Sequence, residues 1–516
     1  MSEGLCRKLP GLTLAAIMAL HLVIASVYCQ GGRPNQDEGW YLEAARLVTS
    51  GRTLYSDFAY VQPPLLPYVY GALGGHHSIE AGRNLSALFA TLAIGLIGLA
   101  AWRVGAAGGL IAAALLAFCP FAITIQVLVK TYALTATLLA LGCLLALRVP
   151  GRGGVIGASL AFALVTLTRN SAAPVLVGWW LWLALDRDRR RYLLLAVAAS
   201  ILPLVAVYLP FWLRDRAALY YNLIGHHASQ SIAEGGTSRQ VQLASMLVVA
   251  SSMVSAAPAM ITLLGVGWFT QRQRLTDDER AAASLAAILL VMLSASQFVS
   301  AHPFQEYQVL ALPPGALLAG LIWGPVLARS SERPMLTGLL VAMVGLVPLV
   351  AIGPDMWDLP GLKMPGGIQG PLHQVVRLVQ AHSAPNEPIF TFQTNVAIEA
   401  NRRLTPGLTL ASFSFVSSDD EARRLHLMSP GLLREQFETA LPATVVVSPG
   451  DLQRIIRATW QGERLVPVAG LEGAARALYG PIVQALDRNY KLVGAVEDVG
   501  QFGESFWVLA RRGERR

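Results

Sequence analysis

The sequence has few charged residues. Aspartate, glutamate, lysine and arginine together make up only 14% of its 516 residues, whereas roughly a quarter is usual in a soluble protein. Hydrophobic residues make up 54%, and the mean hydropathy is +0.49. This composition excludes an ordinary soluble protein and indicates a polytopic membrane protein.

Cysteine is also scarce. The four cysteines, at positions 6, 29, 119 and 143, lie in apolar sequence at spacings that match no metal motif. They therefore imply neither a disulfide framework nor a zinc site. The net charge of +8 does not by itself indicate a nucleic-acid partner, because the placement of the charges matters more than their sum.

Long apolar runs are abundant. A helix needs about 20 mostly apolar residues to cross a bilayer, and we predict a helical bundle of about 11 spans. The spans cover residues 11–29, 84–101, 108–127, 131–147, 154–168, 172–185, 192–212, 243–270, 281–300, 308–328 and 335–353. The first run resembles a signal peptide but lacks a convincing cleavage site, so we interpret it as an anchor.

Lysine and arginine are distributed unevenly between the loops. One alternating set is rich in them, as in "DRDRRRY" (186–192), while the opposite set holds little more than Lys130 and Arg169. Basic loops stay in the cytoplasm. We therefore expect a cytoplasmic N-terminus in the inner (cytoplasmic) membrane, and place loops 30–83 and 213–242 outside with the chain beyond the last span.

The composition changes after the last span. Residues 1–353 form the predicted membrane module, and residues 354–370 are a Pro/Gly-rich linker. In residues 371–516, the runs "EPIFTF", "ATVVVS", "YKLVGAV" and "SFWVLA" are typical of strands, with helical patterns between them. We predict an extracytoplasmic α/β domain here. It contains no GxGxxG, Walker A, CxxC or nucleophile-elbow motif.

The stretch "NQDEGWYLEAARLVTSGRTLYSDFAYVQPP" (35–64) places two acids, Asp37 and Glu38, where the first span leaves the lipid. Carboxylates next to hydrocarbon are costly, so they indicate a functional site. The apolar positions that follow predict an amphipathic helix on the outer membrane surface, capped by Asn35 or Asp37 and ended by Gly51. First-turn acids are also favoured by capping and by the helix dipole, so this role stays open.

The segment "YSDFAYVQPPLLPY" (55–68) is rich in tyrosine and proline. Pro63 and Pro64 fix the backbone, and we expect them to prevent a helix. Irregular backbone at membrane depth is tolerated only where it is buried or lines a cavity. We therefore predict an ordered cap over a cavity.

Together with "GRNLSALFATLAIGLIGLA" (82–100), "YQVLALPPGALLAG" (307–320) and "TFQTNVAIEANRRLTPGLTLASFSF" (391–415), these stretches resemble membrane glycosyltransferases of the GT-C superfamily. They are most similar to bacterial relatives of the protein O-mannosyltransferases and the lipid A aminoarabinose transferases. The resemblance implies a GT-C-like bundle that takes a sugar from a polyprenyl-phosphate carrier outside the membrane. It also implies that Asp37 is the catalytic base.

Inverting displacement at a sugar carbon needs a base, cations for the departing phosphate, and exclusion of water. We predict Asp37 as the base, with Glu38 supporting it or holding the acceptor. Lysine and arginine are natural phosphate partners, although a basic residue at a helix end can also simply reach toward the interface. The candidate substrate-binding residues are Tyr60, Gln62, Arg83, Lys130, Arg169, His302 and Tyr307.

A metal is not favoured. Many GT-C enzymes carry a second acid between the third and fourth spans, often linked with a metal, but here "VKTYA" supplies Lys130 and no carboxylate. This departure favours direct binding of the phosphate by basic side chains, and leaves a divalent metal possible. The expected partners are the polyprenyl-phosphate sugar, membrane lipids, and a glycan, lipid or protein acceptor.

Other functions remain open. A surface polysaccharide polymerase or ligase would use the same bundle and a lipid-linked donor. A lipid-linked glycan transporter would be expected to carry ionisable residues in mid-span or repeated broken helices, and the spans show almost none. A scaffold would not require the stiff loop with its acids.

Overall fold

The computed structural model describes most of the chain. The described residues are 3–228, 246–247, 257–298, 304–329 and 369–513. The predicted span 335–353, the candidate residue His302 and nearly all of the linker 354–370 lie outside these ranges.

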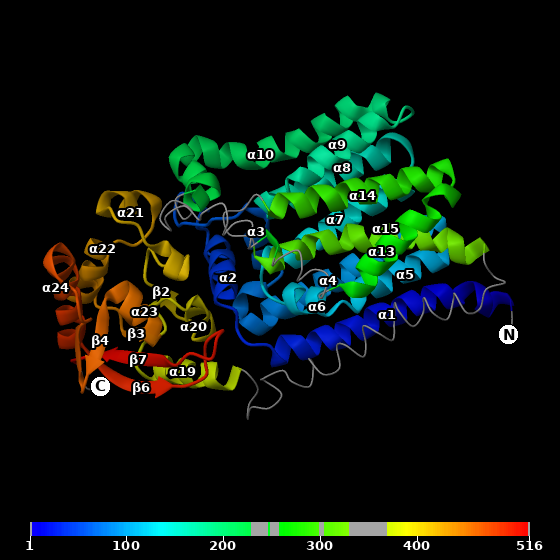
Figure 1. The fold of residues 1–516 in the computed structure, drawn as a ribbon. Coiled ribbons are helices and arrows are strands. Elements are labelled where there is room, and N and C mark those ends of the chain that lie inside the picture. Colours follow the sequence, from blue (N-terminus) through cyan, green and yellow to red (C-terminus); the bar gives the residue numbers. More distant parts are fainter. Residues whose placement is uncertain (1–2, 229–245, 248–256, 299–303, 330–368, 514–516) are drawn as a thin grey trace.

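A bundle of apolar helices forms the larger part of the molecule, with the N-terminus at one end and an α/β domain beyond the other (Figure 1). Its helices are α1 (Glu3–Gly31), α4 (Ile79–Ala101), α5 (Ala106–Ala117), α6 (Pro120–Gln126), α7 (Thr131–Arg148), α8 (Gly151–Thr168), α9 (Pro174–Leu185), α10 (Leu193–Tyr220), α13 (Pro258–Gln271), α14 (Asp277–Gln297) and α15 (Leu312–Arg329). Each predicted span within the described ranges overlaps one of them. The chain is therefore a multi-pass helical membrane protein.

The described part of the chain accounts for fewer spans than the 11 predicted for the whole chain. Seven helices of the described part are long and apolar enough to cross a membrane, and α5 with α6, bent by 62°, would make an eighth. The predicted number was larger because it counted this bent pair, the shorter helices α9 and α13, and the span outside the described ranges.

Small residues allow close helix packing. A Cβ atom on Gly320 of α15 would lie 2.5 Å from the carbonyl oxygen of Gly108 of α5, and one on Gly108 would lie 2.8 Å from the Gly320 carbonyl. Such contacts are typical of membrane helices, which associate by close packing because lipid gives no hydrophobic drive between them.

Helix α10 continues beyond residue 212, where the second predicted outside loop begins. Asp215 interrupts it with non-helical torsions (φ −153°, ψ 91°), and a π-helical turn, Tyr221–Gly225, follows its end. The first part of loop 213–242 is therefore helical.

Residues 30–83, named the first outside loop after their predicted position, contain α2 (Gln36–Thr49) and α3 (Leu65–Ala72). The predicted surface position of α2 is wrong, because all residues from Glu38 to Ala45 are buried. The prediction did not include the packing of the α/β domain against the polar side of α2. The prolines also do not prevent a helix: α3 begins directly after Pro64, where proline's fixed φ is compatible with a first turn.

The α/β domain confirms the predicted fold class. Its main sheet has the order β2-β1-β3-β7-β6, parallel on the β2-β1-β3 side and antiparallel from β3 through β7 to β6. The strands are β1 (Pro388–Thr391), β2 (Arg403–Leu404), β3 (Thr444–Val447), β6 (Tyr490–Val496) and β7 (Phe506–Arg511), with a separate pair β4 (Ala458–Gln461) and β5 (Arg464–Pro467). The helices are α19 (Gln369–Ala381), α20 (Thr394–Glu399), α21 (Asp419–Leu425), α22 (Pro430–Glu435), α23 (Pro449–Asp451) and α24 (Gly473–Asn489).

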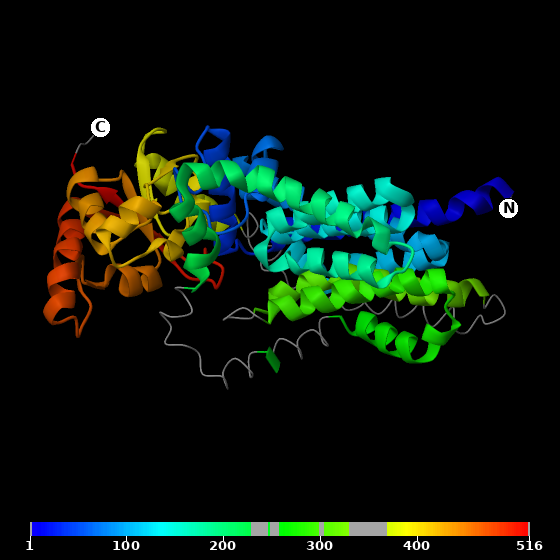
Figure 2. The same cartoon turned by 90° about the horizontal axis from the view of Figure 1, so that it is seen from above.

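Helix α2 lies between the bundle and this domain, which Figure 2 shows from above. Gly39 on α2 packs directly on α20. A Cβ atom there would overlap the main-chain nitrogen of Asn395 and the hydroxyl of Thr394.

Polar contacts reinforce this docking. Arg33 pairs with Asp498 at 2.7 Å, and the Glu399 carboxylate accepts a 2.6 Å hydrogen bond from the main-chain N–H of Ile79 at the start of α4. The domain therefore holds both the first outside loop and the end of the bundle.

Gly39→Ala tests this packing. We expect the added methyl to push α2 away from α20 and to reduce the free energy of unfolding by roughly 1–3 kcal/mol. Thermal and denaturant unfolding of the purified protein would measure the change. Gly480→Ala on α24 is the matched control, since its Cβ would meet nothing within 4 Å. Equal stability of the two variants would contradict the close contact.

Candidate active site

The start of α2 is fixed by a capping box. The Asn35 side chain accepts from the main-chain N–H of Asp37, and the Glu38 carboxylate accepts from the main-chain N–H of Asn35 at 2.7 Å. Reciprocal caps of this kind satisfy the free N–H groups of a helix start. Asp37 thus has a defined position on the first turn.

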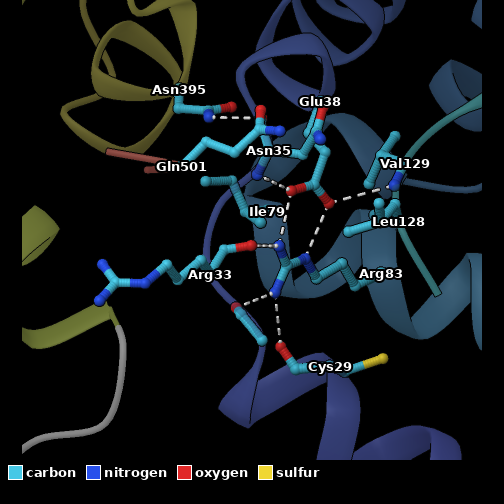
Figure 3. Close-up of polar contacts among 12 residues, drawn as sticks. Cys29, Arg33, Asn35, Glu38, Ile79, Arg83, Leu128, Val129, Asn395 and Gln501 are labelled. Carbon is cyan, nitrogen blue, oxygen red and sulfur yellow. Dashed lines mark hydrogen bonds and ion pairs between the residues drawn. The ribbon is translucent and has the colours of Figure 1, made fainter. Parts of the chain in front are cut away.

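Glu38 and Arg83 form an ion pair with no exposed surface on either side chain. Arg83 donates to both Glu38 oxygens, at 2.7 and 2.6 Å, and its three other N–H groups donate to the carbonyls of Cys29, Gly32 and Arg33 (Figure 3). All five donors of the guanidinium group are therefore used.

Glu38 also accepts a 3.1 Å bond from the main-chain N–H of Val129, on the short segment that joins α6 to α7 (Figure 3). The pair links the end of α1, the start of α2, α4 and this segment. Because neither side chain has a free polar atom, the geometry favours a structural role for both, over the catalytic role predicted for Glu38 and the substrate contact predicted for Arg83.

Asp37 and Lys130 form a second ion pair. Asp37 directly precedes Glu38 in the sequence, and Lys130 directly follows Val129. The Lys130 ammonium nitrogen lies 2.9 Å from Asp37 Oδ2, and 3.1 and 3.3 Å from the two carboxylate oxygens of Glu306. Side-chain exposure is 5% for Lys130 but 25% and 26% for the two acids. The acids therefore open toward solvent while the lysine lies beneath them.

Burial on its own would lower the pKa of the Lys130 ammonium. The nearby carboxylates of Asp37 and Glu306 outweigh this effect and raise the pKa above its ordinary value. Lys130 is therefore a permanent cation at neutral pH. The phenol of Tyr132 also donates to Glu306, at 3.1 Å, and so helps to orient that carboxylate.

Arg169 is a second buried cation at the same end of the bundle. Its guanidinium carbon lies 4.5 Å from the ring centre of Tyr132 and 4.9 Å from that of Tyr307. Nε donates to Ser171 and one terminal nitrogen donates to Thr131, each at 2.9 Å. Within the described part of the chain, its other three N–H groups have no partner, so they are free to bind an anion.

Aromatic side chains line the neighbouring wall. Trp40 stacks on Tyr41 with ring centres 3.7 Å apart, and the Trp40 ring nitrogen donates to Asp37 at 3.3 Å. Tyr60 meets both rings edge-on, and its buried hydroxyl has no partner among the described residues. Burial raises the pKa of the Tyr41 phenol, which therefore keeps its proton. All three aromatic side chains are buried.

The structure brings together Asp37, Lys130, Arg169 and Tyr307 of the predicted set, with Tyr60 in the adjacent wall. Gln62 contributes only its main-chain carbonyl, which accepts from Tyr55 at 2.8 Å, so its predicted substrate contact stays a prediction. The same holds for His302, which lies outside the described ranges.

Sequence reasoning missed Glu306, Tyr132 and Tyr41. Glu306 is the single acid in the stretch "AHPFQEYQ" (301–308), and Tyr132 follows Lys130 by two residues. These neighbourhoods were the available signals. The partners themselves come from distant parts of the chain and follow only from the fold.

The two acids of this site already share a cation. The Lys130 ammonium lies within ion-pair distance of both carboxylates. The described ranges also contain no group of three or more His, Cys, Asp and Glu side chains that could hold a metal.

Comparison with solved structures shows that the chain shares its fold with two membrane glycosyltransferases, ArnT and an archaeal oligosaccharyltransferase. ArnT from Cupriavidus metallidurans, in the apo state, gives a TM-score of 0.65 at 15% identity, with 96% of this chain and 97% of that chain covered. ArnT bound to undecaprenyl phosphate gives 0.64, with the same identity and coverage.

The oligosaccharyltransferase of Archaeoglobus fulgidus, in the apo form, is also similar. It gives a TM-score of 0.53 at 11% identity, with 85% of this chain and 70% of that chain covered. No protein-family model matches the sequence, and neither does any curated protein. The likeness is therefore one of fold.

Glu38→Gln tests the buried ion pair. Glutamine keeps the size of the side chain but leaves the Arg83 charge unpaired, so we expect a loss of about 3–5 kcal/mol in the free energy of unfolding. Asp278→Asn is the control, because it breaks an exposed pair with Arg103 that contributes at most about 1 kcal/mol. Denaturant unfolding in detergent would compare them, and similar losses would contradict a structural anchor.

Proposed function

We propose that the protein is an inverting glycosyltransferase that moves a sugar from a polyprenyl-phosphate carrier to an acceptor at the outer face of the cytoplasmic membrane. The observation that carries this proposal is the pairing of Asp37 with Lys130 next to the uncommitted donors of Arg169. The bound undecaprenyl phosphate of ArnT, a protein of the same fold, supports the donor class. The bias of basic residues toward alternate loops supports the orientation.

Arg169 is the primary ligand of the donor phosphate. Its stacking between two tyrosines fixes the guanidinium plane, and its three remaining N–H groups match the oxygens of a phosphate. Little side-chain freedom is then lost when the donor binds.

Lys130 binds the same phosphate by exchange. Its three N–H donors already face Asp37 and the two oxygens of Glu306. A phosphate oxygen therefore takes the place of a Glu306 oxygen, and the partly exposed glutamate turns toward solvent.

Asp37 is the base. It accepts the proton of the acceptor hydroxyl while the new bond between that oxygen and the sugar C1 forms. The bond from C1 to the phosphate oxygen breaks on the opposite face, and polyprenyl phosphate leaves with the electron pair. This single displacement inverts the configuration at C1. The aromatic wall excludes water that would otherwise compete with the acceptor.

Asp37→Asn tests the base. We expect the rate of sugar transfer to fall by at least about 100-fold, because asparagine cannot accept the proton. The measurement is transfer of radiolabelled sugar from a polyprenyl-phosphate donor to envelope extract by the protein in proteoliposomes. Asp420→Asn, an exposed acid of the α/β domain, is the control. A folded Asp37→Asn variant with near-normal transfer would contradict the assignment.

Arg169→Met tests the phosphate contact. We expect the Kd for undecaprenyl phosphate to rise by about 10-fold or more, because charge-assisted hydrogen bonds are lost. Arg169→Lys keeps the charge but not the planar fork, and should give an intermediate loss. Arg148→Met is the control and should leave the Kd unchanged, because Arg148 lies at the opposite end of α7 from Thr131, the residue that Arg169 contacts. Binding can be followed by isothermal titration in detergent, and an unchanged Kd for Arg169→Met would contradict the role.

A further inference from the structure

A separate cavity of about 1090 Å³ lies where the first outside loop meets the α/β domain. One wall is the second half of α2 with the loop that follows it, and includes Arg46 and Arg52. The other wall comes from the segment 385–436 and includes Arg403 and Arg423. This volume is that of a substantial ligand site.

Cationic donors in the cavity are only partly used. Arg46 pairs with Glu43 at 2.6 Å, and Arg423 pairs with Glu435 at 2.8 Å. Arg403, which is exposed, donates only its Nε, to the Asn386 carbonyl at 3.1 Å.

Arg52 is exposed too, and its side chain has no partner in the described ranges of the chain. The terminal nitrogens of Arg403 are likewise unbonded there. Each wall therefore offers guanidinium N–H donors that have no partner in the described part of the chain.

The cavity and the candidate active site share α2. Asp37 lies on the first turn of this helix, and Arg46 lines the cavity nine positions later. At a rise of about 1.5 Å per residue, the two are roughly 14 Å apart along the helix. A molecule that reaches both must be longer than a single sugar ring.

We infer that this cavity binds the acceptor, and that the acceptor is a saccharide bearing carboxylate or phosphate groups. The inference rests on the proposed function. Guanidinium groups bind such anions through paired hydrogen bonds. Asn401, Thr409 and Gln436 add amide and hydroxyl groups to the lining, and these match the hydroxyls of a sugar.

The test is binding of defined probes to the full chain in detergent. We expect the carboxylated trisaccharide trigalacturonate to bind at least about 10-fold more tightly than neutral maltotriose. Arg52→Ala and Arg403→Ala should each weaken trigalacturonate binding by about 10-fold. Arg424→Ala is the matched control, because Arg424 is an exposed neighbour of Arg423 outside the cavity lining, and it should bind as the unchanged protein does.

Two outcomes would overturn the inference. The first is equal binding of trigalacturonate by the Arg52, Arg403 and Arg424 variants. The second is arginine-dependent binding of glycerophosphoglycerol, a lipid headgroup, without binding of trigalacturonate, since this would identify a lipid site.

A parallel assay of donor turnover separates this inference from the proposed function. Normal sugar transfer without arginine-dependent binding contradicts the cavity assignment alone. Arginine-dependent binding of trigalacturonate in a protein that does not transfer sugar supports the anionic saccharide site and contradicts the proposed transfer.

Discussion

The arrangement at the end of the bundle that faces the α/β domain depends on the buried ion pair between Glu38 and Arg83. Removing two charges from water is costly, and the cost is offset only because each polar atom of the pair has a partner. Glu38 accepts from the N–H of Val129, and the residues adjacent to these two, Asp37 and Lys130, form the ion pair of the candidate site. The Glu38–Arg83 ion pair thus fixes the position of the candidate catalytic pair, Asp37 and Lys130.

The α/β domain completes this arrangement from the other side. Asn395 donates to the Asn35 carbonyl at 2.9 Å, so the capping residue of α2 is held by both modules. The close fit at Gly39 leaves no room for even a methyl group between α2 and α20. We therefore regard the first outside loop as the shared core of two modules.

Much of this fold could be predicted from the sequence. The spans follow from long apolar runs, and β1, β3, β6 and β7 follow from short apolar runs between turns. The strand β2 could not be predicted, because two residues acquire strand geometry only by pairing with β1. The burial of α2 was hidden for a related reason: Glu38 and Glu43 look like a solvated face until their partners Arg83 and Arg46 are placed.

Only part of the candidate site could be predicted from the sequence. The sequence alone identifies Asp37, Lys130 and Arg169 as candidates, because an isolated charge at a membrane boundary is costly and therefore indicates a function. Arg83 has the same signature in the sequence, and only its five filled donors distinguish an anchor from a ligand-binding residue. Glu306 carries no periodic or motif signal, so its contact with Lys130 required the assembled bundle.

The full occupation of Lys130 by two carboxylates has a consequence for the resting protein. The site carries its own counterions, so it needs no small anion from solution to remain neutral between turnovers. In the proposed reaction, an arriving donor replaces an internal acid and does not fill an empty cationic hole. Carrier lipid without a sugar would then be released readily, because the Glu306 carboxylate competes with its phosphate for the Lys130 ammonium.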